Sequence, residues 1–516
     1  MISQLRVNSL LSKQAFFPTA ESRQRVKDDG FSPRPLLSLG RRSFPLVRIG
    51  AAMIALALCA ALLCGCKKES QGKPPAAFVP PTAPVSWEPF LDTLQVRALK
   101  FFLETTDQAT GLAPDRWPSQ SPSSIAAVGF GLTCYPIAVE RKLISREGAA
   151  HRTLNTLRFF YQLPQNDQAE ASGYKGFFYH FLKIPSGARE WRCELSTIDT
   201  ALLLGGVLFS QSYFDGVNEA EQEIRRLADS LYCRVDWRWA MADTNGIKTA
   251  WFPEKGFGPH IWDGYDEAMI LYFLALGSPT HPVPESVWQT WTEPYVWAEY
   301  YGLEFVSFGP LFGHQYSHCW IDFRDIQDAF MKEKGIDYFE NSRRATYSQQ
   351  AYGRENPRAY RDYSENIWGL TACDGPKDTT FVVDGRERKF WSYRARGVSF
   401  DWIEDDGTLA PTAIGGSVAF APEICIPVLK AMRAKYDTLL WKQYGFLDSF
   451  NPTYITPKTP NGWFDHDYLG IDQGPIAIMI ENLRNGFVWE VMKKNPHIVR
   501  GMPRAGFTDG WLENVE

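Results

Sequence analysis

Cysteine is scarce in this chain, and its placement excludes a disulfide scaffold. Nine cysteines occur in 516 residues, and three of them, Cys59, Cys64 and Cys66, lie in one apolar run near the N-terminus. The other six are widely separated and form no CxxC pair. Six scattered cysteines are too few for disulfides to stabilise the fold of a chain of this length. We therefore expect mainly buried free thiols, with one or two disulfides as the alternative.

Several catalytic motifs are also missing. The chain has no GxSxG, GxxxxGK[ST], GxGxxG or HExxH sequence, which argues against a serine hydrolase, a P-loop nucleotidase and a zincin. His314 and His318 lie one helical turn apart, a spacing that can bind zinc, but no adjacent acid or third ligand accompanies them. We therefore predict no metal and no cofactor.

Positive charge is scarce outside the N-terminus. Residues 1–66 hold 9 of the 54 Lys and Arg but only 3 of the 59 Asp and Glu, which leaves 45 basic and 56 acidic residues, a net charge of −11, in the rest. An acidic body repels phosphate backbones, so nucleic acid is not expected as a partner. A neutral polar ligand fits this charge better.

The N-terminus has the features of an export signal. Three arginines precede the apolar run 49–65, which is too short and wrongly flanked for a typical spanning helix. The run ends in Leu63-Cys64-Gly65-Cys66 and turns polar at once, which resembles a bacterial lipobox with Cys66 as the acylated residue. We predict a signal region over 1–66 and a location in the bacterial cell envelope, on the periplasmic face or outer membrane. Lipid would be the only membrane contact; an uncleaved short anchor is the alternative.

A Pro-rich segment separates this signal from the rest of the chain. Residues 71–86 hold five prolines in sixteen residues and few large apolar groups, which is typical of an extended tether. We therefore predict a tether over 67–86 and a single globular domain over 87–516, since closed barrels often exceed the usual domain length of about 150 residues.

The body shows helical periodicity throughout. Apolar residues recur at helical spacing in about a dozen stretches, namely 90–102, 124–141, 154–161, 196–214, 219–233, 263–276, 285–300, 320–332, 338–352, 422–436 and 473–484. Residues 123–139 and 198–209 are apolar nearly all round, so other helices must enclose them. We predict an all-α fold, a double-layered helical barrel, with one small β-hairpin over 379–384 and 389–393.

Two acidic clusters lie at loop mouths beside aromatic residues. In the first, Ser196 and Asp199 have the spacing of a capping box at a helix start, whereas Glu194 falls outside that helix. In the second, Asp263, Asp266 and Glu267 follow Trp262. Three acids within five residues repel one another, so one of them is expected to have a raised pKa, as a general acid needs.

Other acids and several tryptophans are spread along the loops. Glu365, Glu423, Asp472 and the segment 401–407, which lacks EF-hand spacing, are interpreted as loop caps or acceptors for sugar hydroxyls. Tryptophan faces stack on pyranose rings, and paired carboxylates in an aromatic cleft are the equipment of glycoside hydrolysis. The tryptophans in or near predicted loops are Trp237, Trp239, Trp251, Trp262, Trp391, Trp402 and Trp463.

Six sequence blocks resemble one known family. The blocks are ELSTIDTAL (194–202), WDGYDEAM (262–269), LGSPTHP (276–282), PLFGHQYSH (310–318), DGTLAPT (406–412) and GIDQGP (470–475). In this order they resemble the glycoamylase-like domain family, whose best understood members are bacterial endo-β-1,2-glucanases of glycoside hydrolase family 144. The resemblance runs from about Phe90 to Phe487. It implies an (α/α)6 barrel, an inverting mechanism, and linear or cyclic β-1,2-glucan as substrate. Lys183 stands where the family leads us to expect an acid.

The prediction is therefore a lipid-anchored hydrolase that cleaves β-1,2-glucan internally. Glu194 and Glu267 are the predicted catalytic pair, one protonating the leaving oxygen and the other activating water, with Asp199 in reserve. An exo-acting enzyme or one for another β-linkage on the same barrel, and a glycan-binding lipoprotein without turnover, are the alternatives. The residues predicted to bind substrate are Trp262, Asp263, Asp266, His314, Gln315, His318, Glu365, Trp402, Asp406, Glu423 and Asp472.

Overall fold

The computed structural model describes residues 87–514. The predicted signal region, its Cys66 and the tether lie outside the described residues. Within them, no helix combines the length and the apolar character that a membrane crossing requires.

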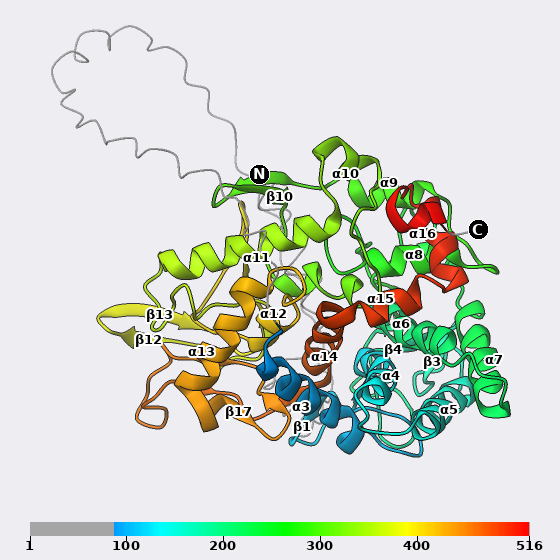
Figure 1. The fold of residues 1–516 in the computed structure, drawn as a ribbon, viewed down its shortest axis with the longest axis horizontal. Helices are drawn as coiled ribbons and strands as arrows, with labels where there is room; N and C mark the ends of the chain where they lie inside the picture. Colours follow the sequence, from blue (N-terminus) through cyan, green and yellow to red (C-terminus); the bar gives the residue numbers. More distant parts are fainter. Residues whose placement is uncertain (1–86, 515–516) are drawn as a thin grey trace, which may run out of the picture.

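Helices are the main regular structure of the described chain (Figure 1). The α-helices are α3 (Pro89–Thr105), α4 (Ile125–Glu140), α5 (Arg146–Gln162), α6 (Thr197–Tyr213), α7 (Glu219–Cys233), α8 (Met269–Gly277), α9 (Ser286–Thr292), α10 (Ala329–Lys334), α11 (Tyr338–Glu355), α12 (Pro411–Gly415), α13 (Pro422–Leu440), α14 (Gly470–Asn485), α15 (Phe487–Met492) and α16 (Pro496–Arg504). Short 3-10 turns are η1 (Trp239–Met241), η2 (Leu311–His314), η3 (Ser317–Cys319) and η4 (Gly510–Asn514).

The strands are short. The largest sheet has five strands in the order β3-β4-β6-β7-β8, and the other sheets are two-stranded. The strands are β1 (Arg116–Trp117), β2 (Ser123–Ser124), β3 (Gly173–Tyr174), β4 (Phe177–Tyr179), β5 (Phe181–Leu182), β6 (Leu195–Ser196), β7 (Ala250–Phe252), β8 (Gly256–Phe257), β9 (Trp297–Tyr300), β10 (Leu303–Val306), β11 (Ala372–Cys373), β12 (Thr379–Val383), β13 (Arg386–Phe390), β14 (Arg394–Ala395), β15 (Gly397–Val398), β16 (Ile403–Glu404), β17 (Trp441–Lys442), β18 (Gly445–Phe446), β19 (Phe450–Asn451), β20 (Trp463–Phe464) and β21 (Tyr468–Leu469).

Helices without a polar face lie inside, as their sequences predict. Almost every residue of α4, α6 and α8 is buried, and α14 is buried along most of its length. Helix α7 instead buries a single stripe and packs against α5 and α6. Figure 1 shows α11 and α13 on one side of α14, and α5 and α7 on the other. Enclosed helices are thus covered by amphipathic ones, because only the latter have a face suited to water.

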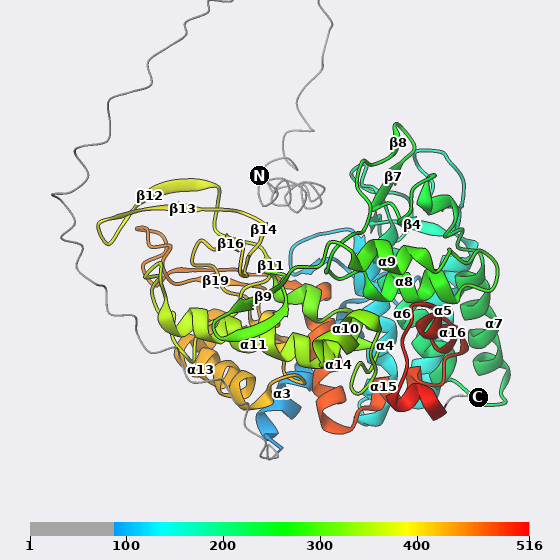
Figure 2. The same ribbon diagram turned by 90° about the horizontal axis from the view of Figure 1, so that it is seen from above.

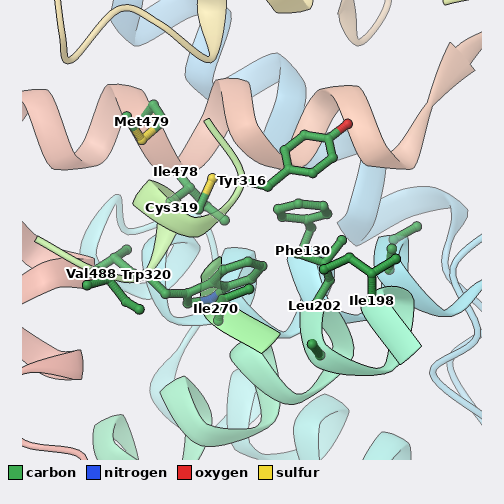
Figure 3. Packing of buried hydrophobic residues seen from close by; sticks show 14 of the residues in the cluster. Phe130, Ile198, Leu202, Ile270, Tyr316, Cys319, Trp320, Ile478, Met479 and Val488 are labelled. Carbon is green, nitrogen blue, oxygen red and sulfur yellow. The ribbon is translucent and has the colours of Figure 1, made fainter. Parts of the chain in front are cut away.

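Two glycines let α4 and α6 approach closely. A Cβ at Gly206 would lie 2.0 Å from the carbonyl oxygen of Gly129, and a Cβ at Gly129 would lie 2.2 Å from that of Leu202. The helix backbones are therefore in direct contact. Figure 3 shows the adjoining core, where Phe130 of α4 stacks on Trp320 with ring centroids 5.1 Å apart and meets the edge of Tyr316.

The strands gather on one side of the helical body. Figure 2 shows β4, β7 and β8 at one end of that side and the hairpin β12–β13 with β14 and β16 at the other. The predicted hairpin is confirmed, since β12 pairs with β13 from Thr379↔Phe390 to Val383↔Arg386. The structure is not entirely helical, because the segments between the helices form these small sheets.

Three predicted helices are wrong in extent. The segment predicted over 263–276 becomes helical only at Met269, because Gly264 adopts a φ of +78° in a preceding turn. The prediction over 285–300 fails after Thr292, where Pro294 follows and the aromatic-rich β9 pairs with β10. Over 320–332, helix α10 begins only at Ala329, because the chain turns at Asp325, whose φ is +61°.

Candidate active site

A pocket of about 280 Å³ opens among the loops on the strand side. Its lining comes from distant parts of the sequence, from Asp115 to Asp472. Acids and aromatic rings alternate around it. Eight of the predicted site residues line this pocket: Glu194, Asp199, Trp262, Asp263, Asp266, Glu267, Trp402 and Asp472.

One wall is built where β6 leads into α6. Strand β6 pairs with β4 on one side and β7 on the other, which fixes Glu194 just before it. Ser196 caps α6 and accepts a hydrogen bond of 3.1 Å from the backbone N–H of Asp199. Its hydroxyl in turn donates to the Asp199 carboxylate. The predicted capping pair is present, although the acid meets the serine hydroxyl rather than the backbone N–H of the cap.

His180 lies between the two acids of this wall. Its Nδ1 is 2.8 Å from Oε1 of Glu194, and its Nε2 is 3.7 Å from Oδ1 of Asp199. Burial alone would lower the pKa of His180, but Asp199 and Glu194 overcome it and raise that pKa to about 9. Burial raises the pKa of Asp199, and the imidazolium of His180 opposes this rise. The wall therefore carries one cation between two carboxylates.

A second wall is the turn before α8. Trp262 donates from Nε1 to the Thr197 hydroxyl at 2.9 Å, which ties this turn to the start of α6. Asp266 accepts from the backbone N–H of Ala268, the residue just before α8, at 2.9 Å and so fixes the turn that leads into this helix. Glu267 lines the pocket beside it, two residues before the helix begins. The two acidic clusters predicted from the sequence thus share one pocket.

A third wall combines acids far apart in the chain. Arg116 contacts Asp115 at 3.2 Å and Asp467 at 3.7 Å and is paired with Asp374. Burial opposes the charge of Arg116, but these acids outweigh it and raise its pKa. Of the acids of this third wall, Asp472 was predicted from the sequence, whereas Asp115, Asp374 and Asp467 were not.

Asp472 forms a buried carboxyl pair with Asp448. Burial raises the pKa of both groups, and the pKa of Asp472 reaches about 7. A hydrogen bond between two carboxyls requires a proton, so one proton is held between them at neutral pH. Asp448 also accepts from the backbone N–H of Asp374 at 2.8 Å and from the Ser449 hydroxyl at 3.0 Å.

Three groups of Asp, Glu and His side chains in the described chain are spaced closely enough to bear on metal binding, one of them Asp465, His466 and Asp467. Oxygens of Asp374, Asp448 and Asp465 lie within 4.8 Å of one another, a spacing that either a proton or a hard cation can bridge. The trio around His180 has the same spacing, but its two carboxylates face different ring nitrogens. That trio is therefore arranged as an ion-paired group rather than a chelate.

Aromatic rings complete the lining. Of the seven tryptophans singled out in the sequence, Trp262 and Trp402 line the pocket. Trp237 is fully buried in the core, and Trp251 packs on Tyr174 with ring centroids 5.1 Å apart. The other lining aromatics are Phe181, Tyr265, Phe308, Phe312, Tyr316 and Tyr393.

Three residues of the GHQYSH block do not line the pocket, contrary to the prediction. His314 is fully buried, and its Nε2 meets the carbonyl oxygen of Phe308 at 3.2 Å. Gln315 donates to the carbonyl oxygen of Ala413 at 2.8 Å and to the Ser417 hydroxyl at 2.7 Å. His318 is also fully buried. Burial lowers the pKa of His314 to about 4 and that of His318 to about 3, so both are neutral.

Three predicted acids also lie outside the pocket lining. Asp406 is completely buried and forms a two-point ion pair with Arg396. Glu423 pairs with Arg343 at 2.7 Å in the first turn of α13. Glu365 lies on an exposed loop after α11. Two of these acids are paired with arginines and the third is exposed, so the structure does not bring them to the pocket.

Several pocket residues escaped the sequence analysis. Asp115, Arg116 and Tyr393 line the pocket and belong to none of the clusters singled out. His180 does too, and the only local signal for it is its place in the aromatic block FFYHFLK. Lys183, three residues on, is paired with Glu170 at 3.5 Å and does not line the pocket.

The chain matches a known family over its C-terminal half. Residues 259–496 match the family model described as "Putative glucoamylase". The predicted resemblance to the glycoamylase-like family is confirmed. The matched region contains the second and third walls of the pocket apart from Asp115 and Arg116.

Individual relatives agree with this match. An exo β-1,2-glucooligosaccharide sophorohydrolase (non-reducing end) from Parabacteroides distasonis is 27% identical over 459 residues, which are 82% of this chain and 58% of the relative. This chain thus spans little more than half of that relative's length. The solved β-1,2-glucanase from Parabacteroides distasonis is 25% identical with a TM-score of 0.70, over 82% of this chain and 60% of that one.

A third relative shows the fold. The endo-β-1,2-glucanase from Chitinophaga pinensis is 24% identical with a TM-score of 0.71, over 83% of this chain and all of that one. The match over the full length of a compact glucanase indicates that the described residues contain the whole of the shared fold.

Proposed function

We propose that this chain is a glycoside hydrolase that cleaves β-1,2-glucan. The observation that carries the proposal is the meeting of Glu194 and Glu267 in one pocket with Trp262 and Trp402. Carboxylates in an aromatic-lined pocket are what glycosidic cleavage requires. The names of the relatives, which act on β-1,2-linked glucans, support this choice of linkage.

The environment of each acid supports a division of labour in an inverting mechanism. The Nδ1 atom of His180 lies 2.8 Å from Oε1 of Glu194 and holds that carboxylate in place. We assign Glu194 to the activation of water, which leaves protonation of the leaving oxygen to Glu267 in the same pocket. Asp199 is the reserve for the role of Glu194, because it faces the other nitrogen of the same imidazolium.

Asp472 is a second candidate for the proton donor. Its pKa of about 7 keeps it partly protonated at neutral pH, as a general acid needs. It also lines the pocket that Glu194 lines. Replacement of Asp472 by Asn would separate the candidates, because loss of turnover in Asp472→Asn with full turnover in Glu267→Gln would move the role to Asp472.

The first experiment compares three Glu→Gln variants on linear β-1,2-glucan. Glu194→Gln and Glu267→Gln should each lose at least a hundredfold in kcat, as expected for removal of a general acid or base. Glu365→Gln is the matched control, because this exposed residue lies outside the pocket, and it should retain wild-type rates. Near-full activity in both pocket variants would refute the assignment.

We propose internal cleavage, and exo action is the second candidate because the curated relative bears that name. Product size distinguishes the two. An endo enzyme releases a ladder of oligosaccharides early in the reaction, whereas an exo enzyme of the relative's kind releases only the disaccharide. Incubation with β-1,3- and α-1,4-glucans tests the linkage, and binding without any product would identify a glycan-binding protein instead.

The finer architecture and the location are proposals as well. The enclosed helices α4, α6, α8 and α14, each covered by amphipathic helices, support a double ring of the (α/α)6 type. Anchoring through an acylated Cys66 would place the enzyme in the bacterial cell envelope. Metabolic labelling with a radioactive fatty acid tests the anchor, and Cys66→Ala should abolish the label.

A further inference from the structure

His180 holds a position that the proposed mechanism does not by itself explain. Its side chain is only 4% exposed, and those of Glu194 and Asp199 are 9% exposed. Its backbone N–H donates to the carbonyl oxygen of Glu194 at 3.0 Å, and its carbonyl oxygen accepts from Ile125 at 3.2 Å. The ring also stacks on Phe181, with centroids 3.9 Å apart and an interplanar angle of 11°. The imidazole is thus fixed from several directions.

The two ring nitrogens face two different carboxylates. A neutral imidazole has one N–H and one lone pair, so it would turn its lone pair toward one of these acids. An imidazolium has two N–H groups and matches both. It forms a hydrogen bond with Glu194 at 2.8 Å and a longer ion pair with Asp199 at 3.7 Å.

The groups packed around His180 favour its protonated, positively charged form. Asp115, from the loop before β1, is a third acid that favours the protonated ring. The neighbouring thiol of Cys193 stays neutral, because burial raises its pKa. The carboxylates face His180 from the segment before β6 and from the first turn of α6.

We propose that His180 is a positioning residue, whose imidazolium between Glu194 and Asp199 pairs with both carboxylates and fixes them at the pocket wall. The role of the two carboxylates in hydrolysis rests on the proposed function, whereas the charge arrangement does not. Without the cation, two buried carboxylates and Asp115 would repel one another, and protonation or movement would relieve that repulsion. His180 therefore controls which of these acids can act as a base.

Titration of the histidines tests the charge without any substrate. The chain has eight histidines, so the full chain with 13C-labelled histidine should give resolvable ring signals. The His180 signal should remain that of an imidazolium at pH 7.5 and titrate near pH 9. Glu194→Gln and Asp199→Asn should each lower the pKa of this one signal, which also assigns it. A His180 ring that is already neutral at pH 7.5 would overturn the proposal.

The pH profile on β-1,2-glucan tests the positioning role. His180→Gln should lose at least tenfold in kcat/KM at pH 7, and its acidic limb should move up by about one unit or more, because loss of a nearby opposite charge shifts a carboxylate pKa by about 1–3 units. His151→Gln, on the exposed side of α5, is the control and should match the wild type. An equal loss at every pH, with no shift of the limb, would show a merely structural role and overturn the proposal.

The two tests also separate this inference from the proposed function. If the wild type cleaves no β-glucan but the ring titrates near pH 9 and responds to both acid variants, the ion-paired arrangement stands and the hydrolase assignment fails. If the wild type cleaves glucan but the ring is neutral at pH 7.5, the hydrolase assignment stands and the positioning role fails.

Discussion

The buried ion pair between Arg396 and Asp406 allows a test of whether Asp406 stabilises the fold or binds substrate. Asp406 belongs to a block that the sequence analysis assigned to substrate, yet neither side chain of the pair is exposed. Arg396 donates from Nε to Oδ1 at 2.7 Å and from Nη2 to Oδ2 at 3.0 Å. Asp406 also accepts from the backbone N–H groups of Trp391 at 2.9 Å and Thr408 at 3.1 Å.

Asp406→Asn should lower the free energy of unfolding by about 3–5 kcal/mol. Removing one partner of a buried pair leaves the other charge uncompensated away from water, and such losses are typically of this size. The carboxylate is well suited to this role, because Arg396 outweighs the effect of burial and lowers the pKa of Asp406. The same substitution should change KM little, because Asp406 does not line the pocket.

Asp384→Asn is the matched control. Asp384 forms the same two-point contact with Arg361, at 2.8 Å and 2.6 Å, but these side chains are 55% and 44% exposed. Solvent screens a water-exposed pair, which contributes little to stability, so this variant should be nearly as stable as the wild type. The two ion pairs thus share the same two-point contact and differ in burial and in the backbone donors of Asp406.

Urea unfolding followed by tryptophan fluorescence measures both variants, with an unchanged m-value required for comparison. A KM series on the same samples reports substrate binding. Equal losses of stability in Asp406→Asn and Asp384→Asn would refute the reasoning from burial. A large rise in KM with unchanged stability would restore the sequence-based interpretation of Asp406 as a hydroxyl acceptor.

Three further outcomes are expected. Gly206→Ala should lower the melting temperature, because the new Cβ would meet the Gly129 carbonyl oxygen at 2.0 Å and overpacking costs about 1–3 kcal/mol; Gly148→Ala, in a partly exposed helix position, should not. The raised pKa of Asp472 contributes stability that is complete below about pH 4 and is lost as pH rises through about 7. Asp472→Asn should therefore flatten urea stability between these pH values, and an unchanged pH slope would contradict the shared proton. Among the six cysteines of the described chain only Cys233 is not buried, so Cys233→Ser should abolish native-state thiol labelling of the peptides that cover residues 87–514.

The spacing of apolar residues in the sequence carries most of the information that predicted the helices. Residues 198–209 are apolar on every side, and such a helix can only be enclosed, which is where α6 lies. The predicted helix 219–233 has the bounds of α7 because Asn218 caps its start. The failures came where tertiary pairing or a turn overrode periodicity, as in β9, whose residues pair with β10 rather than continue α9.

The pocket was only partly predictable because two walls are local and one is not. Glu194 and Asp199 lie five residues apart beside a helix start, so a single stretch of sequence reveals them. Asp115 and Asp472 are brought together only when β1 pairs with β21, through Arg116↔Leu469 and Trp117↔Tyr468. No local sequence pattern predicts a pairing between segments about 350 residues apart. In the sequence alone, an acid that caps a loop also cannot be distinguished from an acid that binds a ligand.

What separates these two kinds of acid is how many internal donors each one has. Asp406 has Arg396 and two backbone N–H groups, so a ligand would have to displace partners that hold the fold together. Asp472 lines the pocket, and its carboxyl partner is another acid, Asp448. A carboxyl whose nearest partner is a second acid is held by a proton that it can give up, whereas one held by arginine cannot change its charge without loss of stability. In a pocket of this kind, catalysis is therefore expected from acids that have no permanent cation beside them, such as Asp472, or that share an ionisable cation, such as the pair around His180.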